Sequence, residues 1–104
     1  MKEITVEEYV KLKESSEDFY LLDVREKHEK EIADIGGDLI PLGNLNSQLP
    51  SVTKDQKLVV YCRSGGRSAQ ATRLLTQAGY TDVYNLVGGI LEYSAKIDNS
   101  IQQY

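Results

Sequence analysis

Short apolar runs dominate the pattern of this chain and predict its strands. Phe19–Val24 and Leu58–Tyr61 are almost continuously apolar or aromatic, as is typical of strands buried on both faces of a sheet. Val83–Leu86 predicts another strand, and shorter strands are expected at Glu3–Ile4 and Leu39–Ile40. Strands that are buried on both faces favour a parallel sheet covered by helices.

Between the apolar runs, the chain has the residue patterns of helices. After the strand at 58–61, one helix face is formed by Ala71, Leu74, Leu75 and Ala78, with Gly79 at the helix end. Thr5 and Glu8 have the spacing of a capping box, so a first helix is expected from there to about Ser15. Glu26–Asp34 predicts a charged helix whose inward residue is Ile32.

The remaining segments complete an alternating pattern of strands and helices. Asn44–Leu49 is expected to form one helical turn. Ile90, Tyr93 and Ile97 mark a last helix after the tight turn at 87–89. Apolar strands that alternate with helices predict an α/β fold around a mostly parallel central sheet. A chain of 104 residues corresponds to a single domain, residues 1–104.

Composition argues against several classes of function. The net charge of −4 argues against broad binding of nucleic acid or of an anionic membrane, which requires a basic surface. One cysteine and one histidine cannot build a disulfide framework or a zinc cluster, so no metal site is expected. The first ten residues lack the apolar core of a secretion signal. A cytoplasmic location, with Cys62 as a free thiol, is therefore expected.

The single thiol lies in a loop of unusual composition, within the stretch VVYCRSGGRSAQAT. The pair Gly65–Gly66 permits a backbone curl whose N–H groups face one centre. Ser68 is the expected N-cap of the following helix, whose positive end would face the same centre. Together with Arg63 and Arg67, these groups favour a thiolate at Cys62 and an anionic substrate beside it. The alternative is a buried structural cysteine, which would need neither the glycines nor the arginines.

Three segments of the chain resemble sequence motifs of the single-domain rhodaneses. Cys62–Ser68 resembles their active-site loop, Leu22–Glu26 with Glu29 resembles their DVRE…E segment, and Asn85–Ile90 resembles the segment before their last helix. The segments occur in the family's order and spacing, and the likeness covers almost the whole chain. The resemblance implies a three-layer α/β sandwich whose mostly parallel sheet has helices on both sides.

The resemblance also implies sulfurtransferase chemistry. Cys62 would attack the sulfane sulfur of an anionic donor such as thiosulfate, form a persulfide and pass the sulfur to a thiophilic acceptor. The loop residues that would cradle the persulfide and bind the donor are Arg63, Ser64, Gly65, Gly66, Arg67 and Ser68. No metal or organic cofactor is needed. The expected partners are the small anionic donor and a protein that supplies or accepts sulfur.

Asp23 and Arg25 are expected to hold the site in place rather than to react. The Asp23 carboxylate would accept hydrogen bonds from nearby backbone, and Arg25 would be the ion-pair partner of Glu29 or of another acid. The chain departs from the family at Ala33–Ile35, where relatives often have a histidine. The only histidine, His28, lies upstream and is expected on the surface.

Two other functions stay open at this point. A phosphatase of related fold would have five residues between its cysteine and its arginine, whereas only four separate Cys62 from Arg67. A loop shorter by one residue suits a single sulfur atom better than a tetrahedral phosphate. A non-catalytic binding module of the same fold is the second alternative, although such a module would not need an intact cysteine loop.

Overall fold

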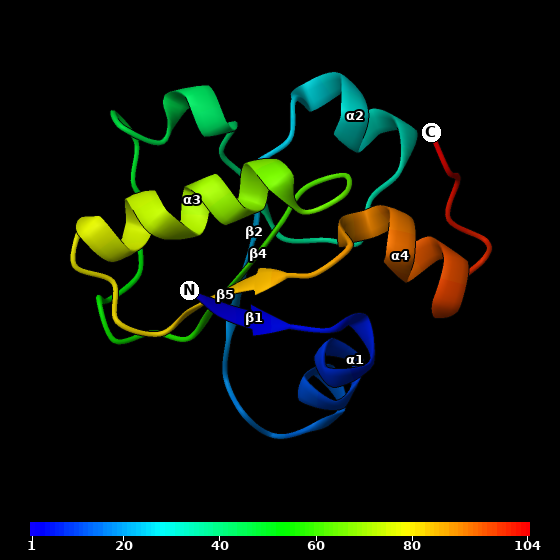
Figure 1. Cartoon of the computed structure of the whole chain (residues 1–104), viewed down its shortest axis with the longest axis horizontal. Helices are drawn as coiled ribbons and strands as arrows, with labels where there is room; N and C mark the ends of the chain where they lie inside the picture. Colours follow the sequence, from blue (N-terminus) through cyan, green and yellow to red (C-terminus); the bar gives the residue numbers. More distant parts are fainter.

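A computed structural model describes residues 1–104 and confirms the α/β fold (Figure 1). Five strands form one parallel sheet in the order β1-β5-β4-β2-β3. The strands are β1 (Lys2–Ile4), β2 (Tyr20–Asp23), β3 (Asp38–Leu39), β4 (Leu58–Tyr61) and β5 (Val83–Leu86). The helices are α1 (Val6–Glu14), α2 (Lys27–Ile32), α3 (Gly66–Gln77) and α4 (Gly89–Lys96), with a short 3₁₀ helix, η1 (Leu42–Asn44). No helix has the length and apolar composition of a membrane span.

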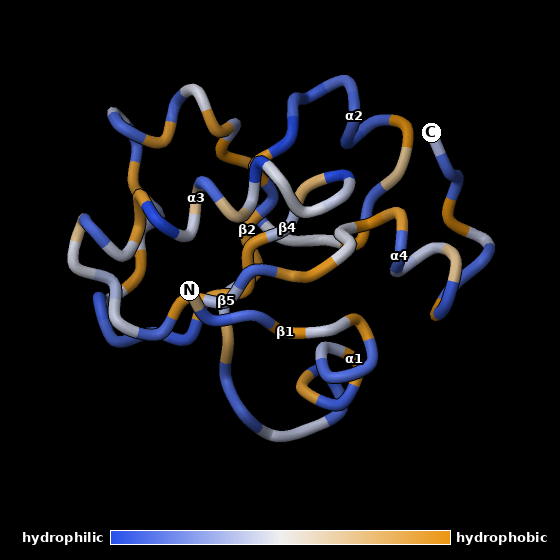
Figure 2. The backbone as a smooth tube through the Cα atoms, viewed as in Figure 1, coloured by the Kyte–Doolittle hydropathy of each residue, from blue (hydrophilic) through white to orange (hydrophobic).

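The alternation of side chains along β4 divides the core into two layers. Leu58, Val60 and Cys62 lie on the side of the sheet covered by α3 and η1. Val59 and Tyr61 lie on the other side, in the cluster formed with α1 and α4. Every residue of β4 is therefore buried, and Figure 2 shows apolar residues concentrated along the inner strands. The predicted three-layer arrangement is confirmed, with a sheet that is parallel throughout.

Two predictions about local structure are confirmed and two are wrong. The capping box of α1 is present, with Glu8 N–H donating to Thr5 Oγ1 at 3.1 Å and Thr5 N–H donating to Glu8 Oε1 at 2.8 Å. His28 is exposed, as expected. Ile32, predicted to face inward, is 41% exposed. The predicted turn at Asn44–Leu49 starts earlier, as η1 at Leu42.

Both differences have a physical cause. The short helix α2 buries its acidic residue Glu29 instead of Ile32, because Glu29 is drawn into a polar network described below. Figure 2 shows that α2 is mostly polar. The 3₁₀ turn begins directly after Pro41, whose carbonyl accepts the N–H of Asn44 at 2.8 Å. Pro41 itself lies at the N-cap of the turn, where its ring fixes φ at −54°.

The strand order brings the motif segments to one edge of the sheet. β4 lies between β2 and β5, and all three strands run in the same direction. The segments that follow them therefore meet at the carboxyl edge, where open α/β sheets place their ligand sites. Asp23 at the end of β2 is the register partner of Tyr61, the residue before Cys62.

Candidate active site

The loop between β4 and α3 curls around the sulfur of Cys62. The sulfur accepts hydrogen bonds from the backbone N–H of Gly65 at 3.1 Å and from that of Ser68 at 3.4 Å. Gly65 has a φ of +111°, a left-handed conformation that favours glycine. Gly66 already belongs to α3 and has no positive φ, so only one of the two glycines uses its conformational freedom.

Ser68 is not the N-cap of α3, which corrects the prediction. The N-cap is Gly65, and Ser68 is the third residue of the helix. The helix begins early because the left-handed glycine turns the chain without a side-chain cap. The Ser68 hydroxyl consequently lies 3.4 Å from Cys62 Sγ and donates to Asn85 Oδ1 at 2.5 Å. The correction thus places a side-chain hydroxyl, as well as an N–H group, beside the sulfur.

The surroundings of Cys62 favour the thiolate. Only 1% of the residue is exposed, and this burial alone would raise the pKa of the thiol. The hydroxyl of Ser68 and the N–H groups of Ser68, Gly65 and Ser64 outweigh burial and lower the pKa below its ordinary value. The positive end of α3, a helix of 12 residues, points at the same atom. These contacts therefore stabilise the negative charge of a thiolate at this position.

The first turn of α4 holds the loop from the other side. Ile90 N–H donates to Cys62 O and Leu91 N–H donates to Arg63 O, both at 3.0 Å. Gly89 permits this approach, because a Cβ at that position would lie 2.5 Å from each of the two carbonyl oxygens. The N–H groups of α4 thus bind two carbonyl groups of the loop, and the N–H groups of the loop itself face the sulfur.

Arg67 of α3 is held by Glu29 of α2. Its two terminal nitrogens donate to Glu29 Oε1 at 2.6 Å and to Oε2 at 2.8 Å. The same carboxylate accepts the N–H of Glu26 at 3.0 Å and the hydroxyl of Tyr104 at 2.9 Å. Contact with the Arg67 guanidinium is the main reason that the pKa of Glu29 falls to about 2. The sequence placed Glu29 in a motif but did not connect it with Arg67.

Asp23 and Arg25 form an ion pair in which both side chains are fully buried. Arg25 Nε and Nη2 donate to the two carboxylate oxygens of Asp23 at 3.0 and 2.8 Å. The backbone N–H of Arg25 also donates to Asp23, at 3.0 Å. The guanidinium reaches Glu29 only at its main-chain oxygen, at 3.3 Å, and binds Ala33 O at 2.8 Å. Arg25 therefore pairs with Asp23, and its contacts with Glu29 O and Ala33 O tie the end of β2 to the middle and the C-cap of α2.

Arg63, the other arginine of the loop, is exposed and contacts Tyr104. Its guanidinium donates to the main-chain oxygen of Tyr104 and lies 5.2 Å from the centre of the tyrosine ring. The Tyr104 hydroxyl accepts from Arg25 Nη1 at 2.9 Å. Nothing in the sequence pattern of the polar C-terminal segment pointed to this contact, because it depends on how 98–104 folds back toward the loop.

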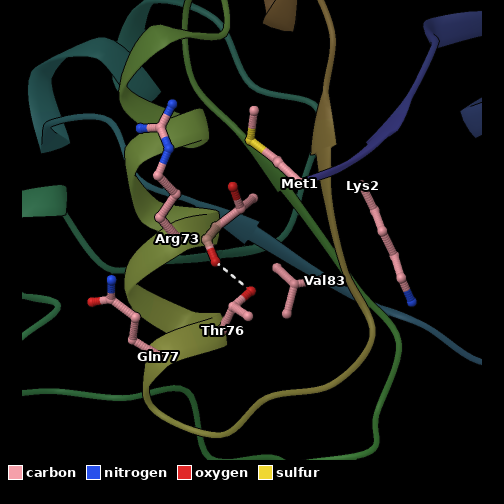
Figure 3. A pocket seen from close by; sticks show the side chains of 7 residues that line it. Met1, Lys2, Arg73, Thr76, Gln77 and Val83 are labelled. Atoms are coloured by element: carbon pink, nitrogen blue, oxygen red, sulfur yellow. Dashed lines mark hydrogen bonds between the residues drawn. The ribbon is translucent and has the colours of Figure 1, made fainter.

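The open pockets of the molecule do not include Cys62 among their lining residues. The pocket in Figure 3 lies beside β1, β5 and α3, and its labelled side chains include Lys2, Arg73 and Thr76. It offers no thiol, imidazole or carboxylate. No group of three or more His, Cys, Asp or Glu side chains is placed to hold a metal ion. The candidate site therefore rests on the loop around Cys62 and not on a deep cavity.

Comparison with known proteins gives a consistent result. A family model, the Rhodanese-like domain, matches residues 5–96. Rhodanese-like/PpiC domain-containing protein 12, chloroplastic, of Arabidopsis thaliana is 38% identical over 112 residues, which cover all of this chain and 38% of that protein. The putative sulfur carrier protein YrkF of Bacillus subtilis is 33% identical, over 92% of this chain and 52% of that protein. The chain spans about a fifth to a half of the length of the curated relatives it matches.

Solved structures agree in fold over the whole chain. A rhodanese-like domain protein from Staphylococcus aureus superposes with a TM-score of 0.82 at 28% identity, covering 100% of this chain and 99% of that one. The human single-domain sulfurtransferase TSTD1 superposes with a TM-score of 0.83 at 28% identity, covering 92% and 97%. These two neighbours are of the same size as this chain.

Proposed function

This chain belongs to the rhodanese-like domain family, and we propose that it is a sulfurtransferase that carries sulfur as a persulfide of Cys62. The observation that carries the proposal is the convergence of two backbone N–H groups and one hydroxyl on a single buried sulfur. Such donors stabilise a negative charge on sulfur without the need for a separate base. A related protein named as a single-domain sulfurtransferase supports the proposal.

The proposed reaction has two displacement steps. The Cys62 thiolate attacks the outer sulfur of thiosulfate, the S–S bond of thiosulfate breaks, and sulfite leaves with the bonding electron pair. The new persulfide anion is stabilised by the N–H groups of the loop. A thiophilic acceptor, such as cyanide or a thiolate, then attacks the outer sulfur and releases the Cys62 thiolate. No electron is gained or lost overall.

The donor-binding groups are proposed to be the cradle residues Arg63, Ser64, Gly65, Gly66, Arg67 and Ser68. Arg63 is exposed and bound only by its own chain at Tyr104, so an anionic donor can replace that contact. Arg67 keeps its bidentate bond to Glu29, which orients the guanidinium. Asp23 and Arg25 contribute by fixing the position of α2, and through it the position of Glu29.

The proposed chemistry indicates which sulfur donor and which sulfur acceptor to expect. The donor is proposed to be thiosulfate or a persulfide, since both present a sulfane sulfur on an anion. The acceptor is proposed to be a thiol or a protein thiolate in a reducing compartment such as the cytoplasm. A related protein is named as a putative sulfur carrier, which supports sulfur delivery between proteins.

Thiocyanate formation from thiosulfate and cyanide tests the proposal. The wild-type protein is expected to turn over, and Cys62→Ser is expected to be inactive while remaining folded, because the side-chain volume hardly changes. Hydrolysis of an aryl phosphate by the same preparation is expected to be absent. Thiocyanate formation by Cys62→Ser contradicts the persulfide mechanism. Phosphate release that depends on Cys62 would indicate the phosphatase alternative. A folded protein that releases no phosphate and transfers sulfur neither from thiosulfate nor from a persulfide donor would indicate a binding module.

A further inference from the structure

Asn85 is a buried polar residue in the middle of the sheet, and the proposed reaction does not yet account for it. It belongs to β5 and is 5% exposed. In the sheet it is the register partner of Val60, two residues before Cys62. Its Oδ1 accepts the Ser68 hydroxyl at 2.5 Å, and its Nδ2 donates to the carbonyl oxygen of Gly65 at 3.3 Å. Both contacts lie in the cradle.

These two contacts fix the orientation of the Asn85 carboxamide. The carbonyl oxygen of Gly65 can only accept a hydrogen bond, so the NH₂ group of Asn85 must face it. The carboxamide oxygen then faces the Ser68 hydroxyl and can accept its proton. An aspartate would keep the acceptor toward Ser68 but would lose the donor toward Gly65. A leucine would lose both.

The Ser68 hydroxyl carries one proton and lies near three acceptors. They are Asn85 Oδ1 at 2.5 Å, Gly65 O at 3.2 Å and Cys62 Sγ at 3.4 Å. While Cys62 is a thiol, the S–H can donate to the Ser68 oxygen and the hydroxyl proton stays with Asn85. When Cys62 is a thiolate, the hydroxyl must turn its proton toward the sulfur, because otherwise its lone pair faces a negative charge.

We propose that Asn85 is a positioning residue for sulfur transfer, which holds the Ser68 hydroxyl beside Cys62 and competes with the sulfur for its proton. This inference rests on the proposed sulfurtransferase function. Arg67, which is paired with Glu29, interacts electrostatically with Cys62, and Arg63 is the exposed arginine that follows Cys62 in the chain. Neither contacts Asn85, so substitution of Asn85 leaves their effect on the thiol in place.

The competition predicts shifts of opposite sign for two variants. Asn85→Leu removes the acceptor and frees the Ser68 proton, so the pKa of Cys62 is expected to fall by about 1, the size of one hydrogen bond to a charged group. Asn85→Asp provides a stronger acceptor, so the pKa is expected to rise. Both variants lose the hydrogen bond to Gly65 O, so a difference between their pKa shifts cannot come from the loss of that bond.

The rate of alkylation of Cys62 by iodoacetamide, followed against pH, measures the pKa directly. Cys62 is the only cysteine of the chain, so the signal has one source. Each variant is also made in a Ser68→Ala background, where the shift on Asn85→Leu is expected to vanish. If urea denaturation shows that Asn85→Leu is unfolded, Asn85→Ala, which also removes the acceptor without adding charge, provides the same comparison with and without Ser68→Ala.

Shifts of opposite sign, with a fall for Asn85→Leu that depends on Ser68, support the proposal. Shifts of the same sign, or a fall for Asn85→Leu that persists in the Ser68→Ala background, overturn it and leave Asn85 with a structural role. The carboxylate of Asn85→Asp also repels the thiolate directly, so part of its rise is expected without Ser68. Alkylation does not require sulfur transfer, so this result stands apart from the outcome of the thiocyanate assay. In an active enzyme, Asn85→Asp is further expected to lower kcat at neutral pH.

Discussion

The buried ion pair of Asp23 and Arg25 gives a defined prediction for the substitution Asp23→Asn. The carboxylate of Asp23 accepts three hydrogen bonds from Arg25 and one from the Tyr61 hydroxyl, at distances between 2.8 and 3.0 Å. Asparagine keeps one acceptor oxygen and replaces the other by an NH₂ group. In place of Oδ1 that group would face the backbone N–H and the Nε–H of Arg25, and in place of Oδ2 it would face Arg25 Nη2 and the Tyr61 hydroxyl, all of which are donors here.

The expected loss of stability follows from burial. Both side chains are 0% exposed, so water cannot solvate the charge that remains on Arg25. Removal of one partner from a buried ion pair costs about 3–5 kcal/mol. Arg25 keeps its bonds to Glu29 O, Ala33 O and Tyr104, which places the expected loss at the lower end, about 3 kcal/mol. For a domain of this size that corresponds to a fall in Tm of about 12–24 °C.

Urea denaturation followed by circular dichroism measures this loss. Asp55→Asn is the matched control, because Asp55 is exposed in the loop before β4, and a change below about 0.5 kcal/mol is expected there. Sulfur transfer is assayed at a temperature where Asp23→Asn is folded, and its kcat is expected to be unchanged because the contacts of Cys62 stay intact. A loss below about 1 kcal/mol would refute the buried-charge argument. A loss of kcat without a loss of stability would assign Asp23 to the reaction itself.

Three other substitutions test the surroundings of the sulfur. The pKa of Glu29 is about 2 in the folded protein, below its value in the unfolded chain, so its stabilising effect is complete above about pH 5 and is lost as the pH falls toward about 2. Glu29→Gln is expected to flatten this acid-induced loss of the free energy of unfolding, and an unchanged pH profile would contradict the argument. Gly89→Ala places a Cβ 2.5 Å from the carbonyl oxygens of Cys62 and Arg63 at a φ of +61°. The free energy of unfolding in urea is therefore expected to fall by about 2 kcal/mol or more, and an unchanged urea midpoint would contradict this. Arg67→Ala is expected to raise the KM for thiosulfate more than it lowers kcat in steady-state kinetics, and an unchanged KM would make Arg67 a structural residue.

The fold could be predicted because its signals are local in the sequence. The apolar run Leu58–Tyr61 is continuous since both faces of β4 are covered, and the same reasoning located β2. The loop from Cys62 could be located because its glycines and arginines are neighbours along the chain. The start of α3 could not be predicted, since a left-handed Gly65 at the N-cap has no side chain that marks the position.

Contacts between distant segments could not be predicted from the pattern. Glu29 appears as one acid among several in a charged helix, and only the fold places it against Arg67. Asn85 lies inside a buried strand, where a polar side chain lowers stability unless it is hydrogen-bonded. A polar residue at such a position was the only sign in the sequence that Asn85 has a specific hydrogen-bonding role. Tyr104 gave no signal, because its contacts depend on the path of the chain after α4.

Intact-protein mass spectrometry under non-reducing conditions tests the central claim most directly. The protein is incubated with thiosulfate, freed of excess reagent and weighed before and after treatment with cyanide, with Cys62→Ser as the control. The proposed mechanism predicts that the wild-type protein alone gains the mass of one sulfur atom and loses it again to cyanide. A folded wild-type protein that gains no sulfur from thiosulfate or from glutathione persulfide contradicts it.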